Sequence, residues 1–172
     1  GNGDMLGYTT TTGLVAATIT PQTAAFDVWL QDGFRTLART VGTYDLADAE
    51  VDLLGLTAAP IPGGDWTAKG PLHFNVAEGG ISNARIDIIS THGRIRIRGD
   101  LATVGQLDGL LRVDNLDLAY IDRLIPSIEQ TLTGQLDVNL ALSGLASNTT
   151  VDGTVRGEVA VDGNRPLDLD VI

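Results

Sequence analysis

Two histidines are the side chains in this sequence best suited to acid–base or metal chemistry. His73 and His92 lie in unrelated segments and form no His-x-x-x-His pair. A zinc site needs further ligands at suitable spacing. Cysteine is absent, which excludes a thiolate site, a Cys nucleophile and a disulfide framework. We therefore expect both histidines to be surface side chains, and we expect no metal and no other cofactor.

The carboxylates are numerous but follow no catalytic pattern. Of the 22 acidic residues, 18 are aspartate, and most occupy the polar positions of alternating segments, where they are solvated and oppose edge-to-edge aggregation. The run Asp168–Asp170 lacks the Gly and Glu of a calcium loop. Neither a Gly-x-Ser-x-Gly elbow nor a Gly-x-x-x-x-Gly-Lys loop occurs. A glycosidase-like pair of catalytic carboxylates remains an alternative, but the sequence singles out no particular pair. We predict that the chain is not an enzyme.

Arg94, Arg96 and Arg98 form the only basic cluster. Such a stripe could contact lipid headgroups or an acidic partner. We favour the simpler interpretation, in which the arginines pair with aspartates of the next strand on a polar outer face. The formal net charge of −11 repels phosphate backbones, so we expect no nucleic-acid partner.

The elements that must position these side chains are β-strands. Apolar and polar residues alternate strictly over 94–100, 106–114, 136–143 and 151–162, a pattern typical of half-buried strands. Similar segments cover 47–53, 66–76 and 84–88, and another begins at 167. The apolar positions that we expect to face inward are Ile95, Ile97, Leu107, Leu111, Val113, Leu136, Val138, Leu140, Leu142, Val155 and Val159.

The connections between these strands are short. Glu78-Gly79-Gly80, His92-Gly93 and Asp162-Gly163-Asn164 are typical turn sequences. Their regular spacing leaves no room for crossover helices, which favours an antiparallel meander. Folding such a sheet on itself gives either a filled core or an open apolar groove, and the alternation alone does not distinguish the two.

One segment has helical spacing. Leu118, Ile121 and Leu124 recur at intervals of three, with Asp117 as a possible N-cap and Pro126 as a stop. We therefore predict one short helix near residues 117–125. The stretch 34–41 could form a second helix or a strand.

The length of 172 residues fits a single domain. We expect residues 1–5 to be a flexible lead and residues 6–172 to be one curled all-β domain cut from a longer repeat protein. In support of repetition, residues 105–113 resemble residues 134–142. No apolar run approaches the roughly 20 residues of a membrane-spanning helix.

Three consecutive segments carry a family resemblance. Residues 107–126 form a predicted strand and short helix, followed by strands at 132–144 and 151–161. Their spacing resembles the repeated Leu-x-Gly-x-Leu-x-x-x-Leu-x-Leu-x-Gly strand of the TamB/AsmA-like family. The match covers about residues 94–163, departs in the proline-free linker 145–150, and is compatible in pattern only over residues 6–93. The matching positions are Leu132, Gly134, Leu136, Leu140, Leu142, Gly144, Gly153 and Val155.

The resemblance implies a β-taco, an elongated curled antiparallel sheet with an apolar inner groove. It implies a periplasmic segment of an inner-membrane-anchored protein of a diderm bacterium, with an Omp85-family outer-membrane partner (TamA). The implied function is to support outer-membrane protein assembly, including that of autotransporters, and phospholipid transport between the two membranes. The eleven inward residues would then line the groove and contact acyl chains or client β-strands.

Two alternatives predict other roles. A structural or adhesive β-solenoid would have a filled core and carry no lipid. A carbohydrate-active β-sandwich would use an Asp pair in a cleft rimmed by aromatic residues, which an aromatic content of 5% makes a poor fit.

Overall fold

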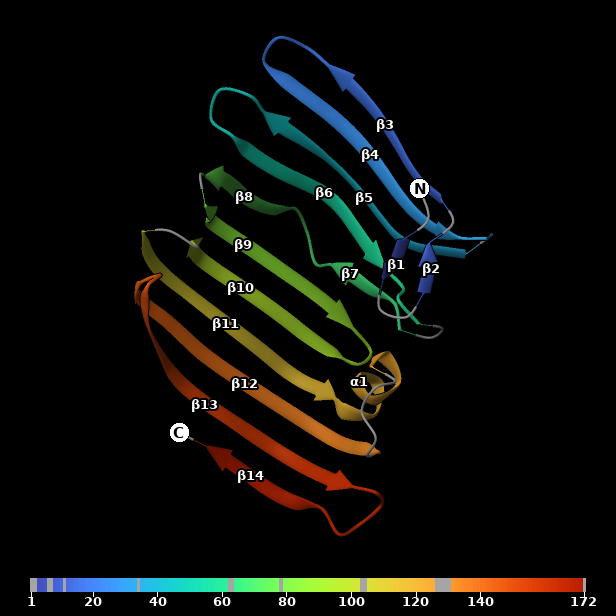
Figure 1. Cartoon of the computed structure of the whole chain (residues 1–172), viewed down its shortest axis with the longest axis vertical. Helices are drawn as coiled ribbons and strands as arrows, with labels where there is room; N and C mark the ends of the chain where they lie inside the picture. The colour runs from blue at the N-terminus through green and yellow to red at the C-terminus, as the bar shows by residue number, and fades with distance from the viewer. Residues whose placement is uncertain are drawn as a thin grey trace.

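The computed structural model is dominated by one antiparallel sheet, and it describes residues 3–5, 8–10, 12–33, 35–61, 64–77, 79–102, 105–125 and 131–171. Twelve strands form this sheet in nearly unbroken chain order, so that β3 and β14 lie at its two edges. Figure 1 shows the strands side by side along the long axis of the molecule, with the one helix of the described residues near one end of the strands. The predicted all-β curled sheet with one short helix is confirmed.

Most successive strands form hairpins joined by short turns, whereas α1 lies between β11 and β12, and β7 and β8 do not pair with each other. Residues 3–5 form β1 (Gly3–Met5), which pairs with β2 (Tyr8–Thr10) in a separate two-stranded sheet. The first part of the large sheet comprises β3 (Thr12–Ile19), β4 (Thr23–Asp32), β5 (Arg35–Asp45), β6 (Glu50–Ala58), β7 (Trp66–Ala68) and β8 (Leu72–Ala77). The second part comprises β9 (Gly80–Ser90), β10 (Gly93–Ala102), β11 (Gln106–Asp117), β12 (Leu132–Leu145), β13 (Asn148–Val161) and β14 (Leu167–Val171).

Residues 66–76, predicted as one strand, are interrupted in the structure. β7 and β8 both pair with β6 on one side and β9 on the other, and residues 69–71 separate them. Pro71 has no N–H to donate to a ladder, and Gly70 has φ +123°, so these residues cannot continue regular pairing. The sheet therefore contains a local break between β6 and β9.

The helix α1 (Leu118–Leu124) follows β11 directly. The Asp117 carboxylate accepts a hydrogen bond from the backbone N–H of Ala119, as expected of an N-cap. The backbone N–H of Ile125 donates to the carbonyl of Ile121 at the other end. The predicted helix and its cap are confirmed, whereas the predicted stop at Pro126 lies outside the described residues.

The ambiguous stretch at 34–41 is a strand from residue 35 onward. β5 pairs with β4 on one side and β6 on the other. Its threonines and valine favour extended backbone because branching at Cβ restricts their rotamers in a helix. Backbone pairing with β4 and β6 therefore makes this stretch a strand, although the spacing of its apolar residues fitted a helix as well.

Candidate functional site

All eleven predicted inward residues share one face of the sheet, which we call the apolar face. Ile95 lies opposite Val113, Val113 opposite Val138, and Val138 opposite Val155. Directly opposed residues of an antiparallel pair project to the same side, so these four form a row across β10–β13. The other seven have the same parity along their strands: Ile97, Leu107, Leu111, Leu136, Leu140, Leu142 and Val159.

The apolar face becomes more exposed toward the β14 edge. Val113 is 9% exposed, whereas Val171, at the end of the same row on β14, is 52% exposed. Leu167, opposite Val159, is 73% exposed. Along β12 the apolar-face positions are only half-buried. These side chains therefore form an apolar surface that is partly accessible to solvent.

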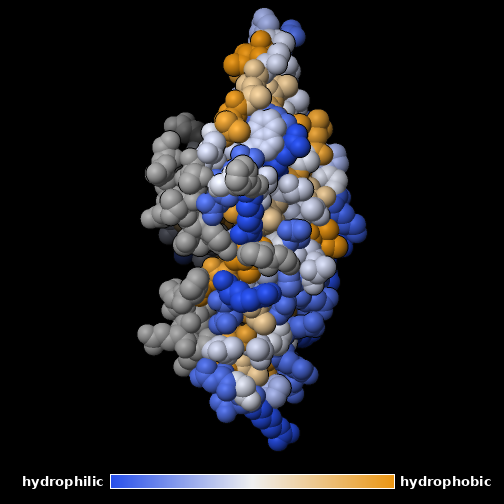
Figure 2. Space-filling model, turned by 90° about the vertical axis from the view of Figure 1, so that its right-hand side faces the viewer, coloured by the Kyte–Doolittle hydropathy of each residue, from blue (hydrophilic) through white to orange (hydrophobic). Residues whose placement is uncertain are grey.

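The total surface area agrees with an apolar face that is largely uncovered. The solvent-accessible surface is 10655 Å², whereas a compact monomer of this mass would expose about 8,000 Å². In the side view of Figure 2 the molecule is narrow, and hydrophobic patches are visible between hydrophilic ones. In the part of the chain that the structure describes, one sheet whose apolar face is covered at one end agrees with this larger area.

One end of the apolar face is covered by α1 and the segment before β7. Ile61, Trp66 and Tyr120 are 6%, 9% and 1% exposed and form the core cluster. The apolar residues packed against this cluster include members of the sheet and of the helix: Ala58, Ile88, Ile95, Leu116, Ile121 and Leu124. Ile95 is therefore the predicted groove residue that lies at the covered end.

Polar contacts fix the aromatic pair at the covered end. The Trp66 Nε1–H donates to the Tyr120 hydroxyl at 2.9 Å, and that hydroxyl donates to the Gly64 carbonyl at 3.3 Å. His92 stacks on the Tyr120 ring with 4.4 Å between ring centroids, and its side chain is only 15% exposed. The prediction that His92 is a surface side chain is wrong, because α1 brings Tyr120 over it.

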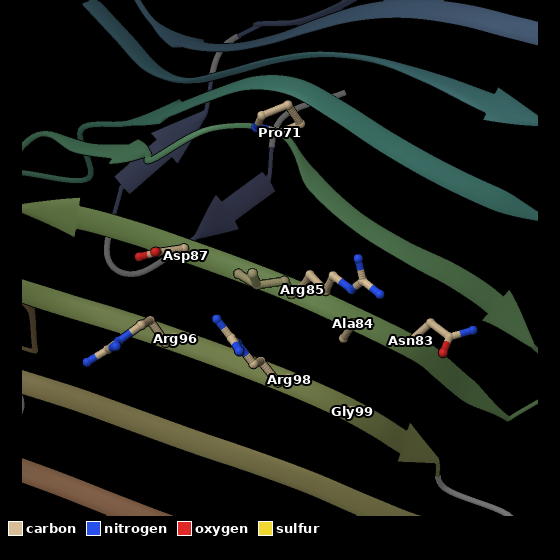
Figure 3. A pocket seen from close by; sticks show the side chains of 9 residues that line it. Pro71, Asn83, Ala84, Arg85, Asp87, Arg96, Arg98 and Gly99 are labelled. Atoms are coloured by element: carbon tan, nitrogen blue, oxygen red, sulfur yellow. The ribbon is translucent and has the colours of Figure 1, made fainter.

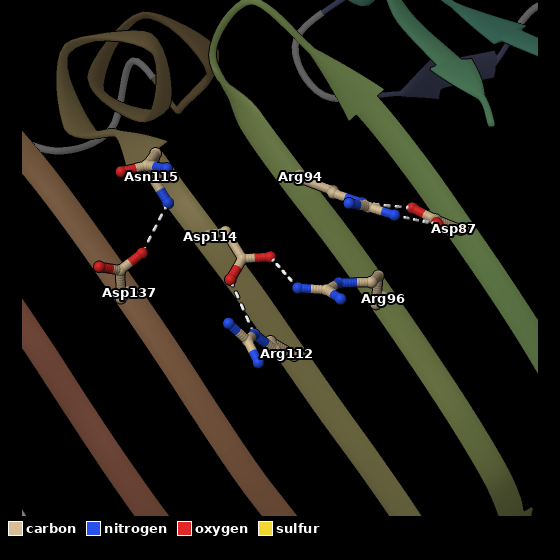
Figure 4. A network of polar contacts seen from close by, with 7 residues as sticks. All are labelled: Asp87, Arg94, Arg96, Arg112, Asp114, Asn115 and Asp137. Carbon is tan, nitrogen blue, oxygen red and sulfur yellow. Dashed lines mark hydrogen bonds and ion pairs between the residues drawn. The ribbon is translucent and has the colours of Figure 1, made fainter.

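The opposite side of the sheet, which we call the polar face, carries ion pairs between neighbouring strands. The Arg94 guanidinium donates to Asp87 on β9, and the Arg96 guanidinium donates to Asp114 on β11 (Figure 4). Arg96 and Arg112 are directly opposed like charges, and Asp114 accepts from both. Pairing of the arginines with strand aspartates is confirmed for Arg94 and Arg96.

These pairs perturb the carboxylates. The hydrogen bond from Arg94 lowers the pKa of Asp87, against partial burial and with help from the positive charge of the same guanidinium. Burial raises the pKa of Asp114, but hydrogen bonds from Arg112 and Arg96 outweigh it and leave that pKa lowered. Both carboxylates are therefore held ionised, which suits a structural salt bridge and not a general acid.

Two other aspartates support bulges in the sheet. Asn83 and Asn115 both have φ +51° and lie where the register shifts. The Asn83 N–H donates to the Asp100 carboxylate at 2.8 Å, and the Asn115 N–H donates to Asp137 at 2.7 Å. A bulge bends a strand and increases its twist. The Asp100 and Asp137 carboxylates therefore stabilise the bends at the two bulges. No sequence pattern predicted the bulges at Asn83 and Asn115.

A shallow concavity of about 530 Å³ lies on the polar face beside the break at Pro71. Figure 3 shows Arg85, Asp87, Arg96 and Arg98 around it. Arg85 and Arg98 are directly opposed and make no ion pair in the part of the chain that the structure describes. This concavity brings together charged groups but no nucleophile with an adjacent base.

Within the described residues, one group of side chains could hold a metal ion. Glu50, Asp52 and His73 each offer a donor atom, and these atoms lie within 4.8 Å of one another. This grouping differs from the expectation of an isolated surface His73 and no metal. The partners of His73 are 21 and 23 residues away along the chain and come together only through the register of β6 and β8.

Comparisons with known proteins give no relative of this chain. No family model matches it, and neither a curated protein nor a solved structure matches it significantly. Among the described residues, no helix is long and apolar enough to cross a membrane.

Proposed function

We propose that this chain is a periplasmic β-groove segment of a TamB/AsmA-like protein. It supports outer-membrane protein assembly, transport of phospholipid between the inner and outer membranes, or both. The observation that carries the proposal is the apolar face, a continuous row of aliphatic side chains that crosses strands from the covered end to β14 and becomes more exposed along the way. The resemblance of residues 94–163 to the family's strand motif supports the same assignment.

The proposed mechanism is physical. Acyl chains lie along the aliphatic residues of the apolar face while their headgroups stay in water. Burial of one methylene contributes about 0.8 kcal/mol, so partial coverage of a chain already gives several kcal/mol. Neighbouring strands are about 4.8 Å apart, so the row from Ile95 on β10 to Val171 on β14 provides a path of roughly 19 Å.

The edges of the sheet offer a second mechanism within the same proposal. Within the described sheet β3 and β14 are the edge strands, and an unpaired edge of such a sheet can accept an added strand through its backbone groups. A client β-strand of an outer-membrane protein would pair along an edge in this way and place its apolar side chains beside the apolar face. In this proposal, the client strand is passed on to an Omp85-family outer-membrane partner (TamA).

The antiparallel order favours this proposal over the adhesive β-solenoid. A parallel β-helix stacks repeats in parallel register, whereas every strand pair of the described sheet is antiparallel. A filled core also needs a second layer over the half-buried residues of β12.

Native mass spectrometry of the purified chain tests the proposal. We expect masses that correspond to one or more bound phospholipids, which disappear when detergent competes for the apolar face. A chain that carries no lipid after expression and takes up none from added phospholipid would contradict lipid carriage. Cross-linking from a photoreactive residue at position 169 to an outer-membrane client would then decide whether strand addition survives as the mechanism.

A further inference from the structure

The polar face gathers an imidazole and two carboxylates that neighbouring strands bring together. Asp52 on β6 lies directly opposite His73 on β8, and Glu50 lies two positions before Asp52 on the same side of β6. The His73 Nδ1 is 2.9 Å from the Asp52 Oδ1 and 3.6 Å from the Glu50 Oε1. One hydrogen bond with Asp52 satisfies the Nδ1 of His73, so the carboxylate of Glu50 beside the same nitrogen is additional to what that pairing requires.

We propose that Glu50, Asp52 and His73 form a binding site for a divalent transition-metal ion, with Zn²⁺ as the best match. Zinc accepts imidazole nitrogen and carboxylate oxygen at about 2.0–2.2 Å. A tetrahedral ion with such bonds separates its donor atoms by roughly 3.4 Å, close to the distances already present. Small rotations of the three side chains therefore complete the coordination.

Exposure leaves room for the remaining ligands. The side chains of Glu50, Asp52 and His73 are 37%, 39% and 27% exposed, so water can occupy the open position of a three-residue site. An imidazole donor favours zinc over calcium and magnesium, which prefer oxygen ligands. The site lies on the face opposite the apolar one, so it does not depend on the proposed lipid function.

The second histidine provides a matched comparison within the chain. The His92 Nδ1 is 2.9 Å from the Asp117 Oδ2, the same separation as in the His73–Asp52 pair. The other Asp117 oxygen accepts from Ala119, and the His92 ring stacks on Tyr120. His92 is therefore committed to the fold, whereas His73 is available to an ion.

One neighbouring cation opposes the ion. Arg85 lies directly opposite His73 on β9, and its side chain extends from β9 on the side of β8 (Figure 3). A guanidinium at this position lowers the affinity of the site by charge repulsion. Removal of this charge should therefore strengthen binding, an effect that non-specific attraction to an acidic surface would show only weakly.

Isothermal titration of the full, chelator-treated chain with zinc chloride tests the site. We expect one strong site per chain, a loss of at least tenfold in affinity for His73→Ala and for Asp52→Asn, and no change for His92→Ala. Arg85→Gln should bind severalfold more tightly. A titration with calcium chloride should give much weaker binding that His73→Ala leaves unchanged.

Spectroscopy of the unmodified chain tests the site without any substitution, so the result does not depend on whether a variant folds. In a nitrogen-15 spectrum of the imidazoles, one equivalent of zinc should shift the His73 signals and leave those of His92 in place. Absence of strong zinc binding by the unmodified chain would overturn the proposal. So would wild-type affinity in His73→Ala or equal shifts of both histidines.

Discussion

The covered and the open parts of the apolar face are built from the same kinds of residues but differ in what lies over them. At the covered end, Trp66 and Tyr120 are almost inaccessible and are joined by a hydrogen bond. On β14, Leu167, Leu169 and Val171 of the same face are 73%, 37% and 52% exposed. The difference teaches that side chains of one kind become a core only where a second layer covers them, and the uncovered part is the surface that the proposed function uses.

The largest expected effect comes from charging the open part. The double substitution Val138→Asp and Leu140→Asp places two carboxylates in the middle of β12 on the apolar face. Because an ionised group loses hydration when an acyl chain covers it, lipid transfer by the full-length protein should be abolished. The measurement is transfer of labelled phospholipid between donor and acceptor vesicles.

Two controls keep that result specific. Asn139→Asp with Ala141→Asp puts the same charges on the polar side of the same strand, and Arg96→Ala alters the polar face; both should be nearly silent in transfer. Circular dichroism checks that every variant is folded. Equal transfer by the Val138/Leu140 variant would refute the assignment of the apolar face as a lipid path.

Next in size is a truncation at the covered end. Tyr120→Ala removes the most buried large side chain, which should lower the free energy of unfolding by about 3–5 kcal/mol. Tyr120→Phe keeps the packing and loses the contacts of the hydroxyl with Trp66 and Gly64, at a cost of about 1 kcal/mol. Urea unfolding measures both, and a Tyr120→Ala loss below that of Tyr120→Phe would show that the aromatic cluster is not a core.

A glycine in the open part should give a smaller loss. Gly134 has φ +123°, and a Cβ there would collide with the carbonyl of Glu158 on β13. Gly134→Ala should cost about 1–3 kcal/mol. Gly55→Ala is the control, because a Cβ at Gly55 meets no atom within 4 Å. Equal melting temperatures of the two variants would contradict the close approach of β12 and β13.

The smallest expected effect is an acid dependence of the polar face, which underlies both parts. The pKa values of Asp87 and Asp114 are lowered in the folded chain, so their stabilisation is present above the ordinary Asp pKa of about 3.9. It is lost as the pH falls below about 4 through the lowered values. Melting temperatures from pH 6 to pH 2.5 should show this slope.

Removal of one arginine tests the cause of that slope. Arg94→Gln deletes the main partner of Asp87 and should flatten the acid dependence. Arg123→Gln is the control, because the Arg123 guanidinium donates to the Ala119 carbonyl and not to a carboxylate. An unchanged slope in Arg94→Gln would assign the acid dependence to other groups.

Alternation in the sequence was sufficient to predict the sheet, its antiparallel order and the shared face of the groove candidates. It works because side chains point to alternate sides of a strand. The parity holds between bulges and reverses across one, as on β11, where Val113 and Leu116 lie on the same face on either side of Asn115. The helix at 118–124 was also predictable, because Asp117 and the spacing of Leu118, Ile121 and Leu124 are local signals.

Contacts between distant residues could not be predicted in the same way. Trp66 and Tyr120 are 54 positions apart, and no local pattern places α1 over β7. The grouping of Glu50, Asp52 and His73 depends on the register between β6 and β8. Because the chain is interrupted at Pro71, this register does not follow from the pairing of β7 with β6. The bulges at Asn83 and Asn115 gave no periodic signal, because each inserts a single residue with positive φ.

The break at residues 69–71 has a mechanical consequence. There the strand between β6 and β9 is divided into the short ladders of β7 and β8, whereas β12 and β13 are joined along fourteen paired positions. A sheet resists bending least where the fewest backbone hydrogen bonds join neighbouring strands, so we expect it to bend most easily at this break. Such bending would change the angle between the two halves of the sheet without unfolding any strand.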